Sequence, residues 1–302
     1  MTIPLNRRLD GCRIGRRQAK EIRERVFKQM LQTRASKYYW WIWGMKLGTK
    51  LFLGERDRVE IMLSIYAAMR IIDDVVDGDA PLPQQFISTL DYVGRYTRFV
   101  QSGGIPTDDV EGLFAYAFAL AVQADIDLRE EVVDILNSLR FDAERRDTRK
   151  PHVLSHRLLQ LHFHTLDIRG TISACLKLAG EDKKGVTVAH LRPLGEASRI
   201  YYNLRDLKED ALAGFCNIPA DAMRLFGLQP LESTAPEEIA AWCESRGVVE
   251  WCRNEGRRGR RLLAEHAKNM ETPLLRSMHW RTRMTLNLMY RNSAQKYFDN
   301  MR

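Results

Sequence analysis

The stretch that decides the fold is Tyr66-Ala67-Ala68-Met69-Arg70-Ile71-Ile72-Asp73-Asp74-Val75-Val76-Asp77. It contains no Pro or Gly, and its apolar residues suit a buried face, so it predicts a helix. Residues four apart share a face of a helix, which places Asp73 and Asp77 on the same side. Carboxylates on an apolar helix are unfavourable to bury unless something compensates them. A divalent cation would do so.

A second stretch has the same character and reads Arg199-Ile200-Tyr201-Tyr202-Asn203-Leu204-Arg205-Asp206-Leu207-Lys208-Glu209-Asp210. Asp206 and Asp210 again lie four apart. Mg²⁺ is usually held by one or two carboxylates together with substrate phosphates, and Arg70 and Arg205 suit phosphate oxygens. The simpler alternative is two solvated acidic faces with ordinary salt bridges. Two such stretches, each with a neighbouring Arg, favour a slot for a diphosphate bridged by Mg²⁺, with Mn²⁺ as the alternative ion.

The two stretches resemble the motifs of the squalene/phytoene synthases. In that family the first motif is Asp-Asp-x-x-Asp after Tyr-x-x-x-Arg, and the core of the second is Arg-Asp-x-x-Glu-Asp, followed by Gly and Pro. The matching residues are Tyr66, Arg70, Asp73, Asp74 and Asp77, then Arg205, Asp206, Glu209, Asp210, Gly214 and Pro219. An N-terminal Ser36 and Tyr39 and a central Gly170-Thr171 also match. The resemblance runs from about residue 25 to 300, and it implies that Asp73, Asp74, Asp77, Asp206 and Asp210 are metal ligands.

The sequence departs from the family pattern at the second motif and in the middle of the chain. Arg199 replaces a Gln, Tyr202 replaces an Asn, and Asn203 lies one residue out of register. Arg199, Tyr202 and Asp206 would share a helix face, so we expect them in one cavity. There Arg199 would offset weaker metal binding by Tyr202.

His164 aligns with a family site Tyr, and Arg169 stands where the family has a small residue. The resemblance would place Ser36, Tyr39, Tyr66, His164, Arg199, Tyr202 and Asn203 at the substrate. For His164 a purely structural role is the competing interpretation, and an aromatic cluster such as the one after Ser36 also suits a core.

The expected fold is all-α. Strand-like alternation is absent, and no linker, repeat or low-complexity segment is present. We expect a basic, flexible arm over residues 1–20 and one domain over 21–302, in which the second motif lies on a helix from about 190 to 211. The resemblance implies an isoprenoid-synthase-like helical bundle with the motifs facing a central cavity.

The resemblance implies a Mg²⁺-dependent prenyltransferase that ionises allylic prenyl diphosphates and couples two of them head to head. A product of squalene, dehydrosqualene or phytoene type would follow, and only squalene needs NADPH, so NADPH use stays open. One alternative is a divergent member that acts as a terpene cyclase or single-prenyl transferase, which the changes at Arg199 and Tyr202 favour. A second is a non-catalytic lipid-binding or assembly subunit, against which the intact aspartates count.

Composition narrows the partners and the compartment. The chain has 302 residues with a net charge of +8, a balance that attracts anions. It carries no zinc-finger, Walker or RNA-binding signature, so we expect no nucleic acid among its partners. The resemblance implies prenyl diphosphates as substrates. The five cysteines form no Cys-x-x-Cys pair and indicate reduced thiols. Reduced thiols favour a cytoplasmic protein. No run reaches the ~18 apolar residues of a spanning helix, so we expect a soluble protein or one peripheral to the membrane, and the oligomeric state stays open.

Overall fold

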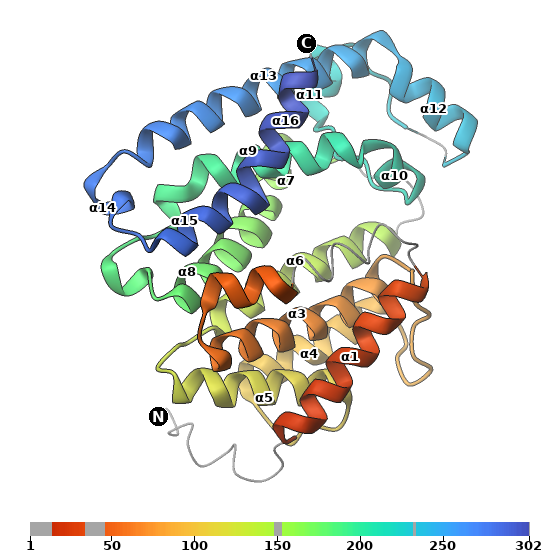
Figure 1. The fold of residues 1–302 in the computed structure, drawn as a ribbon. Helices are drawn as coiled ribbons and strands as arrows, with labels where there is room; N and C mark the ends of the chain where they lie inside the picture. Colours follow the sequence, from red (N-terminus) through yellow and green to blue (C-terminus); the bar gives the residue numbers. More distant parts are fainter. Residues whose placement is uncertain (1–13, 34–45, 148–152, 232–233, 302) are drawn as a thin grey trace. The chain divides into compact units, whose positions relative to one another are not determined.

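The computed structural model describes residues 14–33, 46–147, 153–231 and 234–301, and the secondary structure of these residues is entirely helical. The all-α prediction is therefore confirmed. Contacts divide the chain into two compact units (Figure 1). Unit 1 comprises residues 1–140 and 174–181, and unit 2 comprises 141–173 and 182–302. The prediction of one domain over 21–302 stays a prediction.

Unit 1 is built around the helix that carries the first motif. Its helices, besides a helical segment at 46–53, are α1 (Arg16–Thr33), α3 (Arg56–Val76), α4 (Thr89–Ser102), α5 (Asp109–Gln123), the first part of α6 (Arg129–Asp147) and most of α8 (Ser173–Ala179). The first helix begins at Arg16, so the last residues of the expected arm over 1–20 are helical. Helix α3 packs against α1, α4 and α5 (Figure 1), and its Ile61, Ala67 and Ile72 are fully buried.

Small residues and a buried ion pair hold α3 in place. Ala67 and Ala68 of α3 and Ala117 of α5 have no exposed surface, and α3 packs against α5. Arg23 of α1 is also buried, and it donates to Ser64 Oγ at 2.7 Å and to Glu60 Oε2 at 2.6 Å. Loss of Glu60 would leave the charge of the buried Arg23 uncompensated.

Unit 2 is built around α9 (Val188–Arg205), whose carboxyl end leads into the second motif. Helix α9 packs against α13 (Arg246–Asn269), α16 (Asn292–Asn300) and the π-helices η2 (His164–Ile172) and η4 (Asn287–Arg291). The remaining elements are α7 (His156–Phe163), η3 (Asp182–Lys184), α10 (Leu207–Leu212), α11 (Ala220–Leu225), α12 (Pro236–Glu244), α14 (Pro273–Arg276), α15 (Trp280–Leu286) and the end of α6.

Local chemistry sets several helix ends. Asp108 caps α5 by accepting from the Glu111 amide at 2.9 Å, and Ser155 caps α7 by accepting from the Leu158 amide at 3.3 Å. Helix α3 ends before Gly78, whose φ of +73° is a conformation that favours glycine.

The Gly-Thr pair lies in the π-helix η2, where Thr171 Oγ1 donates to the Leu166 carbonyl at 3.0 Å. π-helical turns inside α-helices occur frequently at functional sites. Gly195 of α9 faces this segment, and a Cβ there would lie 2.9 Å from Ile168 Cγ1 and 3.0 Å from Ile172 Cδ1. Glycine therefore sets how closely α9 approaches η2.

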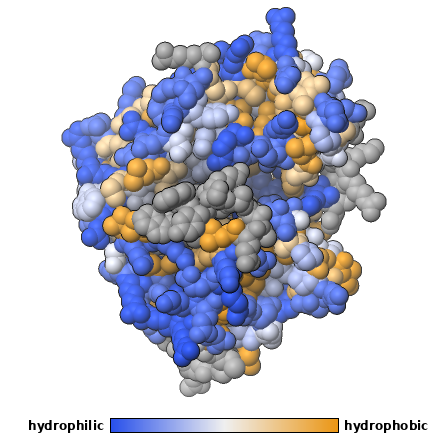
Figure 2. Space-filling view, turned by 45° about the vertical axis from the view of Figure 1, so that its right-hand side comes forward, coloured by the Kyte–Doolittle hydropathy of each residue, from blue (hydrophilic) through white to orange (hydrophobic). Residues whose placement is uncertain are grey.

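None of the described helices has the length and apolar character that a membrane crossing requires. Figure 2 shows one face of the molecule, on which apolar side chains form separate patches among hydrophilic ones.

We expect Gly195→Ala to lower the free energy of unfolding by about 1–3 kcal/mol, because the added methyl group overpacks the contact with Ile168 and Ile172. Urea denaturation followed by circular dichroism measures the change. Gly48→Ala is the matched control, since a Cβ there would meet no atom within 4 Å outside the backbone of its own helix; it should be neutral or stabilising by up to about 1 kcal/mol. Equal free energies of unfolding for the Gly195→Ala variant and the parent would mean that α9 and η2 move apart to accommodate the methyl group without a loss of stability.

Candidate active site

The first motif lies at the carboxyl end of α3, and its carboxylates surround Arg70. Arg70 Nη1 donates a hydrogen bond to the carboxylate of Asp73. Arg70 Nη2 lies 2.5 Å from Asp74 Oδ1. The side chains of Arg70 and Asp74 are each 15% exposed. Asp77 follows the last helical residue, and its amide donates to the Asp73 carbonyl at 2.7 Å. The helical relation between Asp73 and Asp77 therefore persists to the helix end.

This placement is electrostatically demanding. The carboxyl end of a helix carries partial negative charge, which disfavours further carboxylates. Burial by itself lowers the pKa of Arg70, but Asp73 and Asp74 outweigh burial and hold that pKa above its usual value. Arg70 thus offsets part of the negative charge. The structure thus shows Arg70 paired with Asp73 and Asp74. That Arg70 also binds phosphate stays a prediction.

Tyr66 precedes Arg70 by one turn, and its ring stacks on Phe27 of α1 with the centroids 6.3 Å apart. Tyr66 also contributes to the raised pKa of Arg70, so it lies near the first motif. Ser36 and Tyr39 lie outside the described residues.

The second motif differs from its expected form because the helix is interrupted. Helix α9 ends at Arg205, Asp206 has φ −99° and ψ 9°, and α10 begins at Leu207. The prediction of one helix over 190–211 is wrong at this point. The Asp210 amide still donates to the Asp206 carbonyl at 2.8 Å, so one helical turn connects the two aspartates across the break.

Arg205 pairs with its sequence neighbour, Asp206. Its Nε donates to Asp206 Oδ1 at 2.6 Å and its Nη2 to Oδ2 at 2.5 Å. The guanidinium also lies 4.8 Å from the centroid of the Tyr202 ring. Both members of the pair are substantially exposed, at 46% and 36%, so the pair contributes little to stability.

The pKa of the Asp210 carboxyl group departs from its ordinary value. Burial is the main cause that raises its pKa, to about 6, and the charge of Asp206 adds to it. A hydrogen bond from Asn217 Nδ2 to Asp210 Oδ2, 2.8 Å long, acts in the opposite direction. Sequence reasoning passed over Asn217, although it lies between the quoted Gly214 and Pro219.

Arg199 is held by a partner that sequence reasoning also missed. Its Nε and Nη2 donate to the two carboxylate oxygens of Asp167, both at 2.6 Å. Its guanidinium lies 4.8 Å from the Phe163 ring centroid. Burial acts to lower the pKa of Arg199, and Asp167 outweighs it, so the pKa is raised. The charge that replaces a neutral amide of the family pattern is therefore already neutralised within unit 2.

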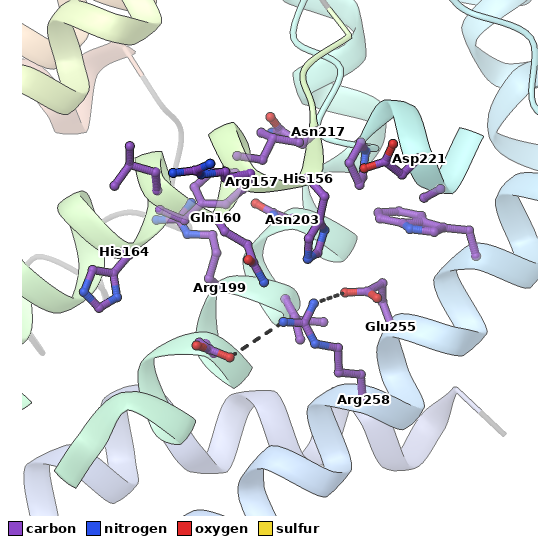
Figure 3. A pocket seen from close by; sticks show the side chains of 18 of the residues that line it. His156, Arg157, Gln160, His164, Arg199, Asn203, Asn217, Asp221, Glu255 and Arg258 are labelled. Atoms are coloured by element: carbon purple, nitrogen blue, oxygen red, sulfur yellow. Dashed lines mark hydrogen bonds and ion pairs between the residues drawn. The ribbon is translucent and has the colours of Figure 1, made fainter. Parts of the chain in front are cut away.

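A cavity of about 580 Å³ opens in unit 2 beside these residues (Figure 3). His164, Arg199 and Asn203 line it, as do Asp167 and Asn217. On another wall Arg258 lies 3.3 Å from Glu255 Oε2 and 3.7 Å from Glu196 Oε2.

Neither Tyr202 nor Asp206 is among the residues that line this cavity. The expectation that Arg199, Tyr202 and Asp206 share one cavity is therefore wrong for this cavity. Helix α9 ends before Asp206, and Asn203, one turn after Arg199, lines the cavity in place of Tyr202.

The donor chemistry of both motifs fits Mg²⁺ held together with a diphosphate. Within the described residues, no group of three or more His, Cys, Asp or Glu side chains could hold a metal ion by itself. Mg²⁺ needs fewer protein ligands, because it keeps waters and takes substrate phosphates. A half-buried carboxyl group with a raised pKa, such as Asp210, is one that a nearby cation would stabilise in its charged form.

The sequence profile of the squalene/phytoene synthases matches residues 49–298, which includes both motifs. The chain belongs to the squalene/phytoene synthase family. Members of this family use prenyl diphosphates as substrates. The protein is therefore a prenyl-transferring enzyme. A non-catalytic subunit is thereby set aside.

A solved structure extends the comparison to the fold. It is described as the crystal structure of squalene synthase HpnC from Alicyclobacillus acidocaldarius, and the similarity covers 95% of each chain with a TM-score of 0.62 and 17% identity. At this identity the likeness establishes the helical fold alone. Among proteins with curated descriptions, none matches the sequence.

We expect Asp210→Asn to stabilise the metal-free protein at pH 7. The folded pKa of about 6 exceeds the usual 3.8, so between these values the folded chain binds a proton that the unfolded chain releases. Stability from this group is present at low pH and is lost as pH rises through about 6. The gain in the variant should reach at most about 3 kcal/mol at pH 7 and shrink towards pH 4. Urea titrations of parent and variant in chelator measure it, and a pH-independent difference would contradict the shift.

A second expectation concerns the Arg199–Asp167 pair. Arg199→Gln leaves the Asp167 carboxylate without its bidentate partner and should lower the free energy of unfolding by about 2 kcal/mol. Adding Asp167→Asn should restore most of the loss, because the stranded charge is removed. Arg224→Gln is the control, since the Arg224–Asp221 pair is exposed and should contribute within about 0.5 kcal/mol. Additive losses in the double variant would mean that the two side chains act independently.

Proposed function

We propose that this enzyme couples two allylic prenyl diphosphates head to head in a Mg²⁺-dependent reaction and gives a hydrocarbon of squalene, dehydrosqualene or phytoene type. The observation that carries the proposal is that each aspartate motif lies at the carboxyl end of the central helix of its unit, with an arginine of that helix paired with at least one of its carboxylates. Membership of the family supports the reaction type. The similar solved structure is that of a squalene synthase, which supports a product of this class.

The aspartates of each motif would hold the metal. Asp73 and Asp77, with Asp74 beside them, are the donors of the first motif, and Asp206 and Asp210 are those of the second. Bound Mg²⁺ supplies electrostatic stabilisation of the negative charge that develops on the departing diphosphate. Mn²⁺ has the same preference for oxygen ligands.

The arginines and aromatic side chains would complete the site. With a metal ion and a diphosphate at the first motif, Arg70 would no longer be needed to neutralise Asp73 and could donate to phosphate oxygens. Arg205 is half-exposed, so its guanidinium can exchange Asp206 for phosphate. The ring faces of Tyr66 and Tyr202 favour a nearby cation.

A single-substrate reaction, cyclisation or prenyl transfer, is the second candidate. It is favoured by Arg199, which is paired with Asp167 where the family pattern has a neutral Gln. A fixed ion pair in place of an amide changes what the adjoining cavity can bind. The product distinguishes the candidates, because coupling doubles the carbon count and cyclisation or transfer does not.

The deciding experiment incubates the purified chain with geranyl, farnesyl or geranylgeranyl diphosphate and Mg²⁺, with and without NADPH, and identifies products by mass spectrometry. We expect a hydrocarbon with twice the carbon number of its substrate. A dependence of product saturation on NADPH would assign the reductive step. Products with the carbon number of a single substrate would overturn coupling and support the second candidate.

We expect Asp73→Ala and Asp206→Ala each to reduce diphosphate release by about a hundredfold or more, since each removes a ligand of the metal that would stabilise the charge on the departing diphosphate. Released diphosphate, measured in Mg²⁺ and again in chelator, reports the effect. The exposed Asp299 of α16 gives the control Asp299→Ala, which should keep the activity of the parent. Full turnover in chelator would refute the metal requirement.

A further inference from the structure

Two residues outside the motifs, Asn217 and Arg145, form a series of hydrogen bonds that ends at Asp210 of the second motif. Asn217 Nδ2 donates to Asp210 Oδ2 at 2.8 Å. Arg145 Nη2 then donates to Asn217 Oδ1 at 3.0 Å. Asn217 is 8% exposed and Arg145 is 6% exposed, so both are shielded from water. The contacts therefore join α6 to the second motif through the segment after α10.

The chemistry of these groups fixes the direction of each hydrogen bond. A guanidinium has only donors, so the group of Asn217 that faces Arg145 must be its carbonyl oxygen. The amide nitrogen of Asn217 then points to Asp210, whose ionised carboxylate only accepts. Rotation of the amide by half a turn would oppose donor to donor at Arg145 and acceptor to acceptor at Asp210. Asn217 thus has one favourable orientation.

Arg145 is itself held from several sides. It donates to the Cys216 carbonyl and to Asp142 Oδ1, both at 3.3 Å, and its guanidinium lies 5.0 Å from the Phe215 ring centroid. His162 Nε2 lies 3.3 Å from the same oxygen of Asp142. A guanidinium with this many contacts has little freedom to move, so it gives Asn217 a fixed point of attachment.

The consequence for Asp210 is geometric. Its side chain could otherwise rotate, but Asn217 engages Oδ2 and so sets the plane of the carboxylate. Oδ1 is then the oxygen directed away from this bond. Residues that hydrogen-bond a metal-binding carboxylate set its orientation, and their loss typically weakens metal binding about 10–100-fold.

We propose that Arg145 and Asn217 are positioning residues that orient the Asp210 carboxylate for a divalent metal ion bound together with diphosphate. The inference rests on the proposed function, because it takes Asp210 as a metal ligand. The competing interpretation is that Asn217 only stabilises the turn between Gly214 and Pro219. In that case its loss would affect folding without acting through Asp210.

The test measures how much Mn²⁺ the full chain needs to retain radiolabelled inorganic diphosphate in equilibrium dialysis. This readout does not depend on turnover. The variants are Asn217→Leu, which keeps the size but cannot donate, Asp210→Asn, and the two combined. Gln295→Leu is the matched control, because Gln295 makes a comparable amide-to-carboxylate bond to Asp299, 3.0 Å long, on the surface of α16.

We expect Asn217→Leu to raise the half-saturating Mn²⁺ concentration about tenfold or more, and Gln295→Leu to leave it unchanged. In the Asp210→Asn background, Asn217→Leu should add no further loss, because its effect runs through that carboxylate. Arg145→Gln should weaken binding in the same direction, again without adding to Asn217→Leu. If Asn217→Leu does not fold by circular dichroism, Asn217→Ala takes its place with the same expected outcome.

Three outcomes would overturn the inference. If Asp210→Asn weakens binding and Asn217→Leu does not, the inference fails while the proposed metal site stands. If the two losses add in the combined variant, Asn217 acts on the structure generally and not through Asp210. If Asp210→Asn itself leaves binding unchanged, both the inference and the proposed role of the second motif fail.

Discussion

The structure depends on how carboxylates are accommodated on helices that are otherwise buried. Helix α3 is the centre of unit 1 and buries Ile72 fully, yet it carries Asp73 and Asp74 in the same turn. Their position at the carboxyl end of the helix is unfavourable for negative charge. Arg70 contacts both carboxylates. The motif is therefore a compact cluster of two carboxylates and one guanidinium. A metal ion would add positive charge to this cluster, and a diphosphate would add negative charge.

The second motif meets the same constraint by different means. Its helix stops at Arg205, which leaves Asp206 partly exposed and Asp210 half-buried on the following turn. The pKa of Asp210, raised to about 6 chiefly by burial, shows that its charge is only partly compensated. Asn217 donates a hydrogen bond to it. Both motifs thus contain aspartates and an arginine, but the carboxylates have different partners in each. Arg70 pairs with two aspartates in the first motif, whereas Arg205 and Asn217 each bind one aspartate in the second.

The departures from the family pattern come with compensating residues. Arg199 introduces a charge that Asp167 neutralises through two hydrogen bonds. Gly195, one turn earlier on α9, brings the helix close to η2, the element that carries Asp167. The substitution at Arg199 is therefore accommodated jointly by α9 and η2, and both members of the ion pair line the adjoining cavity.

The sequence by itself determined the helical class, the aspartate motifs and the family, because helical periodicity and motif spacing are local properties of the chain. Only the tertiary structure decided the partners of the charged groups. Asp167 meets Arg199 from 32 residues away, and Arg145 meets Asn217 from 72 residues away. Such pairings depend on how helices pack, and no local pattern encodes them.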